Sequence, residues 1–160
     1  MTKRKIRGMA ILLTVLVGLT IGWSIWNGKL YEYDHEAFQA IAESLTFEKK
    51  IPMKMPFKKL EVSQRNLNKV EEKLNVTLTN VNKETMEVYI GIEPKESFDG
   101  LKGEEVQINN NRGTFISEDS GKRILAWQED DVHYQITYFY KLTPKEVSKK
   151  TLIRMAEAFA

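Results

Sequence analysis

The spacing of hydrophobic and polar residues divides the chain into three regions. Residues 8–26 form an uncharged run, GMAILLTVLVGLTIGWSIW. In residues 34–45 the apolar positions recur at the spacing of one helix face. From Leu60 onward apolar and polar residues alternate, which is typical of strands with one buried face. The pattern therefore predicts a membrane-length helix, a short amphipathic helix and then a sheet.

The uncharged run predicts a single transmembrane helix. At about 1.5 Å per residue, a helix over residues 8–26 nearly crosses a hydrocarbon core of about 30 Å. Basic residues precede it, and Trp23 and Trp26 lie at its far end, where indole rings favour the membrane interface. We therefore expect residues 1–7 to be a cytoplasmic basic stub and the C-terminal part to face outward from the cell membrane.

Two further interpretations concern the same run. A cleaved signal peptide is the alternative to a retained anchor, but no A-x-A-like site follows and aromatic residues crowd the cleavage zone. Gly18 and Gly22 form a G-x-x-x-G pair, which is either a helix-dimer face or the ordinary glycine content of a membrane helix. We expect a retained anchor and leave the oligomeric state open.

Residues 27–59 are predicted to be a helix and a connector. The helix covers 34–45, with Asp34 as its cap. The connector that follows, KKIPMKMPFKKL, contains Pro52 and Pro56 and should be extended. Its lysines and methionines suit a position near lipid headgroups, but a solvated linker is the interpretation we favour.

Residues 60–160 are predicted to form an outward α+β domain, an antiparallel sheet of six or seven strands with a helix before and after it. Thr143 is the expected N-cap of the last helix, with Pro144 first in the helix and Glu146 completing a capping box. The alternating segments are 60–64, 73–81, 84–94, 105–109, 113–117, 123–129 and 132–140, and 94–105 reads as a loop.

The segment AWQEDDVHYQI, residues 126–136, combines acids and a histidine between two apolar stretches. A tight turn accounts for the acids, because turns are exposed and Asp accepts turn dihedrals. The chain has 2 histidines and no cysteine, without a zinc-ligand spacing, so we expect no metal and no cofactor. Asp130 and His133 remain candidates for contact with a partner.

Aromatic residues gather in the same hairpin. Tyr134 and Tyr138 lie on one face of the last predicted strand, and Trp127 lies on the strand before it. Core packing under the C-terminal helix is the first interpretation. The functional alternative is a partly open groove for a peptide or acyl chain, lined by Trp127, Tyr134 and Tyr138.

Charge is segregated along the chain. Four of the 24 basic residues lie in the first eight positions, and the remaining 20 face 22 acidic residues, so the rest of the chain carries about −2. A protein that binds nucleic acid usually carries a basic patch, and none is evident after the stub. We therefore expect no nucleic-acid partner. Neither a nucleophile motif nor a phosphate loop is found, so we also expect no enzymatic activity.

Residues 113–159, GTFISEDSGKRILAWQEDDVHYQITYFYKLTPKEVSKKTLIRMAEAF, resemble DUF4367, a domain of unknown function found in bacilli and clostridia, which are Gram-positive bacteria. The resemblance covers mainly residues 104–160, with MPFK at 55–58 as a further match. It rests on a strand ending in tryptophan, an acidic turn, an aromatic-bearing strand and a helix. The matching positions are Trp127, Tyr134, Leu142, Glu146, Ala156 and Glu157.

The resemblance implies an outward domain behind a single membrane helix, with a sensing or interaction role and no catalytic residues. The stub of residues 1–7 is too short for a domain that binds a sigma factor, so we do not expect an anti-sigma role. We expect a non-enzymatic envelope module that binds another envelope protein, a peptide or a lipid-like ligand. The alternatives are a structural accessory subunit of a membrane complex and, less favoured, a hydrolase.

Overall fold

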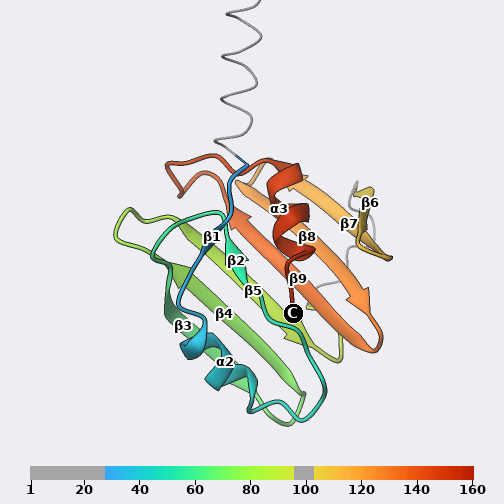
Figure 1. Cartoon of the computed structure of the whole chain (residues 1–160). Helices are drawn as coiled ribbons and strands as arrows, with labels where there is room; N and C mark the ends of the chain where they lie inside the picture. The colour runs from blue at the N-terminus through green and yellow to red at the C-terminus, as the bar shows by residue number, and fades with distance from the viewer. Residues whose placement is uncertain (1–27, 96–102) are drawn as a thin grey trace, which may run out of the picture.

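The computed structural model describes residues 28–95 and 103–160 of the 160-residue chain. Seven antiparallel strands form one sheet in the order β3-β4-β5-β9-β8-β7-β6 (Figure 1). The strands are β3 Glu61–Asn68, β4 Lys73–Thr79, β5 Thr85–Gly91, β6 Glu104–Ile108, β7 Asn111–Glu118, β8 Lys122–Glu129 and β9 Val132–Phe139. The fold class is therefore α+β, as expected, although strands predominate among the described residues.

The described part of the chain has no helix long and apolar enough to cross a bilayer. The predicted span 8–26, with its Gly18–Gly22 pair, lies outside the described residues. Residues 96–102 of the predicted loop also lie outside them.

The seven alternating segments each correspond to a strand. β3 is longer than expected and ends at Asn68. The expected acidic turn is confirmed: Glu129 pairs with Val132 across the β8–β9 hairpin, and Asp130 between them has a φ of 53°. Asp reaches this left-handed region more readily than most residues.

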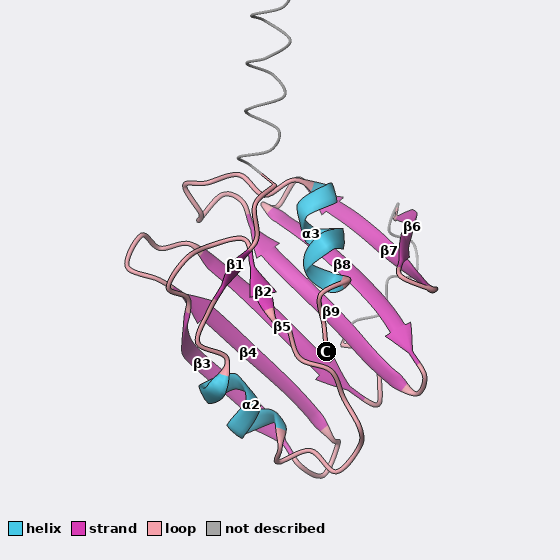
Figure 2. Cartoon of the chain, viewed as in Figure 1, coloured by secondary structure: helices cyan, strands magenta, loops and turns pink. Residues whose placement is uncertain are grey.

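One face of the sheet carries the hydrophobic core. Leu74, Val76 and Leu78 of β4 are fully buried, whereas the residues between them are partly exposed. Two helices lie over this face, α2 Glu36–Ala42 over the β3 side and α3 Lys149–Ala156 over β9 and β8 (Figure 2). We call this the covered face, and the opposite side of the sheet the second face.

The connector is part of the core, so its interpretation as a solvated linker is wrong. Ile51, Met55, Phe57 and Leu60 are all at most 8% exposed. Two backbone pairings hold the segment against the fold. β2 Lys54–Met55 pairs with β1 Tyr31–Glu32, and residue Ile51 exchanges two backbone hydrogen bonds with Ala160 at the C-terminus. The apolar residues between the lysines provide the burial that a solvated linker lacks.

Helix α2 forms close to the expected position. The predicted cap at Asp34 is wrong, because the N-cap is His35, although the backbone N–H of Glu36 donates to Asp34 Oδ1 at 3.2 Å just before the helix. Phe38, Ile41 and Ala42 are the buried residues of this helix. They share one hydrophobic cluster with the sheet, so the described part of segment 27–59 packs with residues 60–160.

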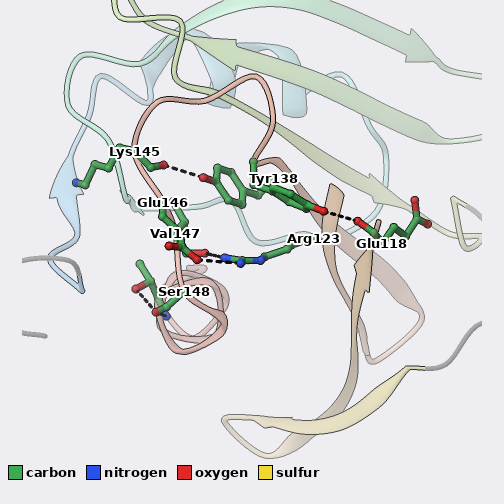
Figure 3. Close-up of polar contacts among 9 residues, drawn as sticks. Glu118, Arg123, Tyr138, Lys145, Glu146, Val147 and Ser148 are labelled. Atoms are coloured by element: carbon green, nitrogen blue, oxygen red, sulfur yellow. Dashed lines mark hydrogen bonds and ion pairs between the residues drawn. The ribbon is translucent and has the colours of Figure 1, made fainter. Parts of the chain in front are cut away.

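Helix α3 begins later than predicted. Its N-cap is Ser148, whose Oγ accepts from the N–H of Thr151 at 3.2 Å, and the predicted cap at Thr143 with its Glu146 box is wrong. Thr143 is buried and its Oγ1 instead accepts from the N–H of Thr85. The intervening loop is fixed by β-strand side chains: Arg123 donates to the Val147 carbonyl, and Tyr138 donates to the Lys145 carbonyl (Figure 3).

Candidate functional site

The five predicted binding residues are divided between the covered face, the second face and the tip of the β8–β9 hairpin. Trp127, Tyr134 and Tyr138 lie on the covered face and are 5%, 3% and 0% exposed. Phe159 packs edge-on against Trp127 and Tyr134, with centroid distances of 5.0 and 5.7 Å. Their face is therefore packed core, the first of the two interpretations. A ligand-binding role for them stays a prediction.

The hydroxyl groups of the two tyrosines are used inside the fold. Tyr134 accepts from the backbone N–H of Lys50 at 3.1 Å, and Tyr138 donates to the Lys145 carbonyl at 2.7 Å. Burial raises the pKa of both phenols, because a phenolate would lose its hydration. These side chains hold the connector and the loop before α3 against β9.

Asp130 and His133 occupy different surroundings. Asp130 is exposed at the hairpin tip, where its carbonyl accepts from Gln128 Nε2 at 2.9 Å. His133 is half-buried and lies on the second face, one residue before Tyr134 on β9. Within the described ranges, no group of three His, Cys, Asp or Glu residues is arranged to hold a metal ion.

The second face carries a concave site that the sequence did not predict. It is a depression of about 210 Å³ over β5, β9, β8 and β7, which we call the second-face cleft. Ala126 of β8 gives it depth, because this short side chain stands between longer cross-strand neighbours. Its polar and aromatic lining includes Tyr89, Lys95, Arg112, Thr114, Gln128, His133 and Gln135.

Tyr89 forms one wall of the cleft. It is 4% exposed, and its hydroxyl donates to the Glu93 carbonyl at 2.7 Å. Burial raises the pKa of this phenol, so it stays neutral. The ring lies over Gly91, where an added Cβ would be 2.5 Å from the Tyr89 oxygen. Because position 91 is a glycine, there is space beside it for the Tyr89 side chain.

A second depression of about 190 Å³ continues on the other side of Tyr89. The two hollows share Tyr89, Pro94 and Lys95. The second is otherwise polar, with Asn66, Lys73, Asn75 and Glu93 around it. The two hollows are therefore neighbours that share one wall.

Several hydrogen-bond donors line the cleft beside its apolar residues. Lys95 Nζ already has partners within the protein, since it lies 2.8 Å from Glu87 Oε2 and 3.3 Å from Asn75 Oδ1. The Arg112 side chain is 82% exposed and is held only loosely by Glu105, at 3.9 Å. Gln135 is 3% exposed and donates to Thr137 Oγ1 at 3.0 Å. Arg112 and His133 are thus the groups best placed to meet acceptor oxygens of a ligand, with Gln128 beside them, although its Nε2 also donates to the Asp130 carbonyl.

Of the predicted residues, His133, Trp127 and Tyr134 are among those that line the cleft, although only His133 belongs to the second face by strand register. The alternation along each strand assigns polar residues to the second face, but the cleft depends on strand order. β5 lies beside β9 although more than 40 residues separate them in sequence, and this pairing places Tyr89 opposite Gln135. Ala126 stands between Leu125 and Trp127 in the chain, so no local pattern marks it as part of a cleft.

Comparison with known proteins gives one match. The family model described as a domain of unknown function, DUF4367, matches residues 49–158. This range begins in the connector and so includes the segment that packs over the sheet. Neither the curated proteins nor the solved structures gave a match. Because the match covers more than half of the chain, the protein belongs to the DUF4367 family.

Proposed function

We propose that this protein is a membrane-anchored, non-enzymatic binding module of the cell envelope. The uncharged run at residues 8–26 supplies a single-pass anchor, and the basic stub before it favours an N-terminus in the cytoplasm. The described domain then faces outward. Its partner is another component of the envelope rather than nucleic acid.

The observation that carries this proposal is the second-face cleft. The covered face is filled by its own aromatic residues, so binding at the tyrosine hairpin would require the core to open. The cleft, in contrast, is partly open to solvent, combines polar and apolar side chains, and lies over four adjacent strands of the sheet. A site on a rigid scaffold holds its polar groups in place without an ordering cost.

The chemistry of the lining indicates the ligand class. Arg112 carries a planar guanidinium with several N–H donors, which suits a carboxylate. Gln128 and His133 add donors beside it, and Tyr89 offers a ring edge for an apolar part of the ligand. We infer an extended polar ligand that carries a carboxylate, such as a peptide segment of an envelope component.

In-cell photocrosslinking of the full-length protein tests this proposal. A photoreactive residue at Gln128, which is exposed at the cleft, should give adducts that mass spectrometry identifies as a carboxylate-bearing peptide or protein segment. The same residue at Ser120, exposed in the β7–β8 turn, is the control site and should give none of these adducts.

A matched pair of variants completes the test. Arg112→Ala with His133→Ala should remove most of the Gln128 adduct, whereas Lys122→Ala, on the same face but outside the cleft lining, should leave it unchanged. Equal adducts from Gln128 and Ser120, or an adduct insensitive to the Arg112 and His133 changes, would show that the cleft is not the binding site.

A further inference from the structure

One end of the domain gathers lysines from three separate segments. The segments are the first described residues, the turn between β4 and β5, and the chain after β9, all in the upper part of Figure 1. Hydrogen bonds join them to the connector: Asn80 Nδ2 donates to the Lys58 carbonyl, and Lys145 Nζ donates to the Pro56 carbonyl. We call this the lysine end, formed by Lys29, Lys58, Lys59, Lys83, Lys141 and Lys145.

Three of these lysines surround one ring. The ammonium groups of Lys29, Lys58 and Lys145 lie 5.6, 5.1 and 5.3 Å from the centroid of Tyr31. Each contact is a cation–π attraction, but the three positive charges also repel one another. Of the acids at this end, Glu146 is paired with Arg123 and Glu84 accepts from Asn80. Other acids at this end are Glu32, Glu61, Glu118 and Asp119.

Two apolar side chains project from the same end. Val81, in the β4–β5 turn, is 93% exposed, and Leu142, after β9, is 68% exposed. Lys83 follows Val81 after one intervening residue, and Lys141 directly precedes Leu142. Exposed apolar residues among lysines are the composition of surfaces that enter the interface of an anionic membrane.

The opposite end of the domain has the opposite charge. It contains the β3–β4 turn, the β8–β9 turn and the end of α3, and Lys50 there is paired with Glu129. Exposed acids at this end are Glu71, Glu93, Asp130, Asp131 and Glu157, and they outnumber its exposed lysines, Lys50 and Lys69, although Val70 in the β3–β4 turn is also 94% exposed. The domain is therefore polarised along its length, with positive charge where the described chain begins at Gly28.

We propose that the lysine end docks on anionic lipid headgroups of the membrane that holds the anchor. This rests on the anchoring part of the proposed function, because the membrane span predicted from the sequence at 8–26 lies directly before Gly28 in the chain, so such an anchor would bring this end to the bilayer surface. The lysines then face the lipid phosphates, Val81 and Leu142 enter the interface, and the acidic end points away. Docking also fixes the domain so that the second-face cleft stands beside the membrane rather than against it.

Hydrogen exchange of the full-length protein in lipid nanodiscs tests the docking. In discs of mixed phosphatidylcholine and phosphatidylglycerol, backbone amides at 80–84 and 140–146 should exchange about tenfold more slowly than in pure phosphatidylcholine. High salt should remove most of this protection, because it screens the attraction. Amides of the β3–β4 turn should not differ between the two lipids.

Charge-reversed variants separate docking from folding. Lys58→Glu with Lys141→Glu should abolish the lipid-dependent protection, and Arg65→Glu with Lys69→Glu, an equal charge change at exposed sites elsewhere, should preserve it. Equal exchange at 80–84 in both lipids, with the protein retained in the discs, would overturn the docking and leave the anchored binding module standing. Loss of the protein from the discs would overturn the anchoring itself, and with it both proposals.

Discussion

The indole ring of Trp127 stacks on the phenol ring of Tyr134, with centroids 5.1 Å apart and planes inclined by 14°. The two residues are cross-strand partners in the β8–β9 hairpin, and Phe159 closes the cluster from the C-terminal tail. The tail is also bound through the backbone, because Ile51 and Ala160 exchange two hydrogen bonds. The hairpin, the connector and the C-terminus are thus joined at one aromatic cluster.

Phe159→Ala should destabilise the protein by about 3 kcal/mol, because it removes a buried ring and leaves a cavity beside Trp127 and Tyr134. Denaturant unfolding of the full-length chain in detergent, followed by far-UV circular dichroism, measures this. Leu142→Ala is the control, since that side chain is 68% exposed and its removal should change stability by less than about 0.5 kcal/mol. Equal stability of the two variants would show that the tail does not pack on the hairpin.

Ser148→Ala should destabilise the chain by about 1 kcal/mol, because Ser148 Oγ accepts the N–H of Thr151 at the start of α3. Hydrogen exchange should locate the loss in the first turn of α3. Ser120→Ala, in an exposed turn, is the matched control and should be neutral. If instead Pro144 began the helix, Ser148→Ala would leave the exchange of Thr151 unchanged.

The difference between Thr143 and Ser148 shows how much of the fold can be predicted from the sequence. Both hydroxyls precede a run with helical spacing, and Thr143 has the stronger local signature, with Pro144 and Glu146 after it. Tertiary contacts decide between them: Thr143 is drawn to the N–H of Thr85, and Tyr138 and Arg123 hold the carbonyls of Lys145 and Val147. No local pattern records these partners.

The strands were predictable because each has one buried face, and burial on one face requires apolar and polar residues to alternate along the strand. The connector was not, since its buried Met55 and Phe57 stand among lysines whose charged ends remain in solvent. The second-face cleft was missed for a third reason. Tyr89 and His133 meet only through the pairing of β5 with β9, and sequence spacing does not specify which strands become neighbours.

Gly91→Ala should destabilise the protein by about 1–3 kcal/mol and deform the second-face cleft, because the new Cβ would lie 2.5 Å from the Tyr89 oxygen. Combining it with Tyr89→Leu should recover part of the loss, since the clashing hydroxyl is then absent. Denaturant unfolding of the two single variants and the double variant gives the coupling. Additive losses would show that the Tyr89 ring does not lie over Gly91.

Alkaline pH should unfold the protein through its buried tyrosines. Burial raises the folded-state pKa of Tyr33, Tyr89, Tyr134 and Tyr138, whereas in the unfolded chain a tyrosine titrates near about 10. Above that pH the folded state holds more protons than the unfolded state, so each such group lowers the unfolding free energy by up to about 1.4 kcal/mol per pH unit until its folded pKa is reached. Below that pH the stabilisation is complete and constant.

Tyr138→Phe isolates one of these groups. At neutral pH the variant should lose about 1 kcal/mol, because the hydrogen bond to the Lys145 carbonyl is gone. Above about pH 10 its stability should fall less steeply than that of the unchanged protein, so the two curves converge. The Lys50 pKa is also raised, by its hydrogen bond to Glu129, and the Tyr138 comparison cancels that contribution because both proteins share it. Parallel curves above pH 10, or tyrosinate absorbance that develops at the ordinary pKa before unfolding, would show that Tyr138 titrates in solvent rather than in the core.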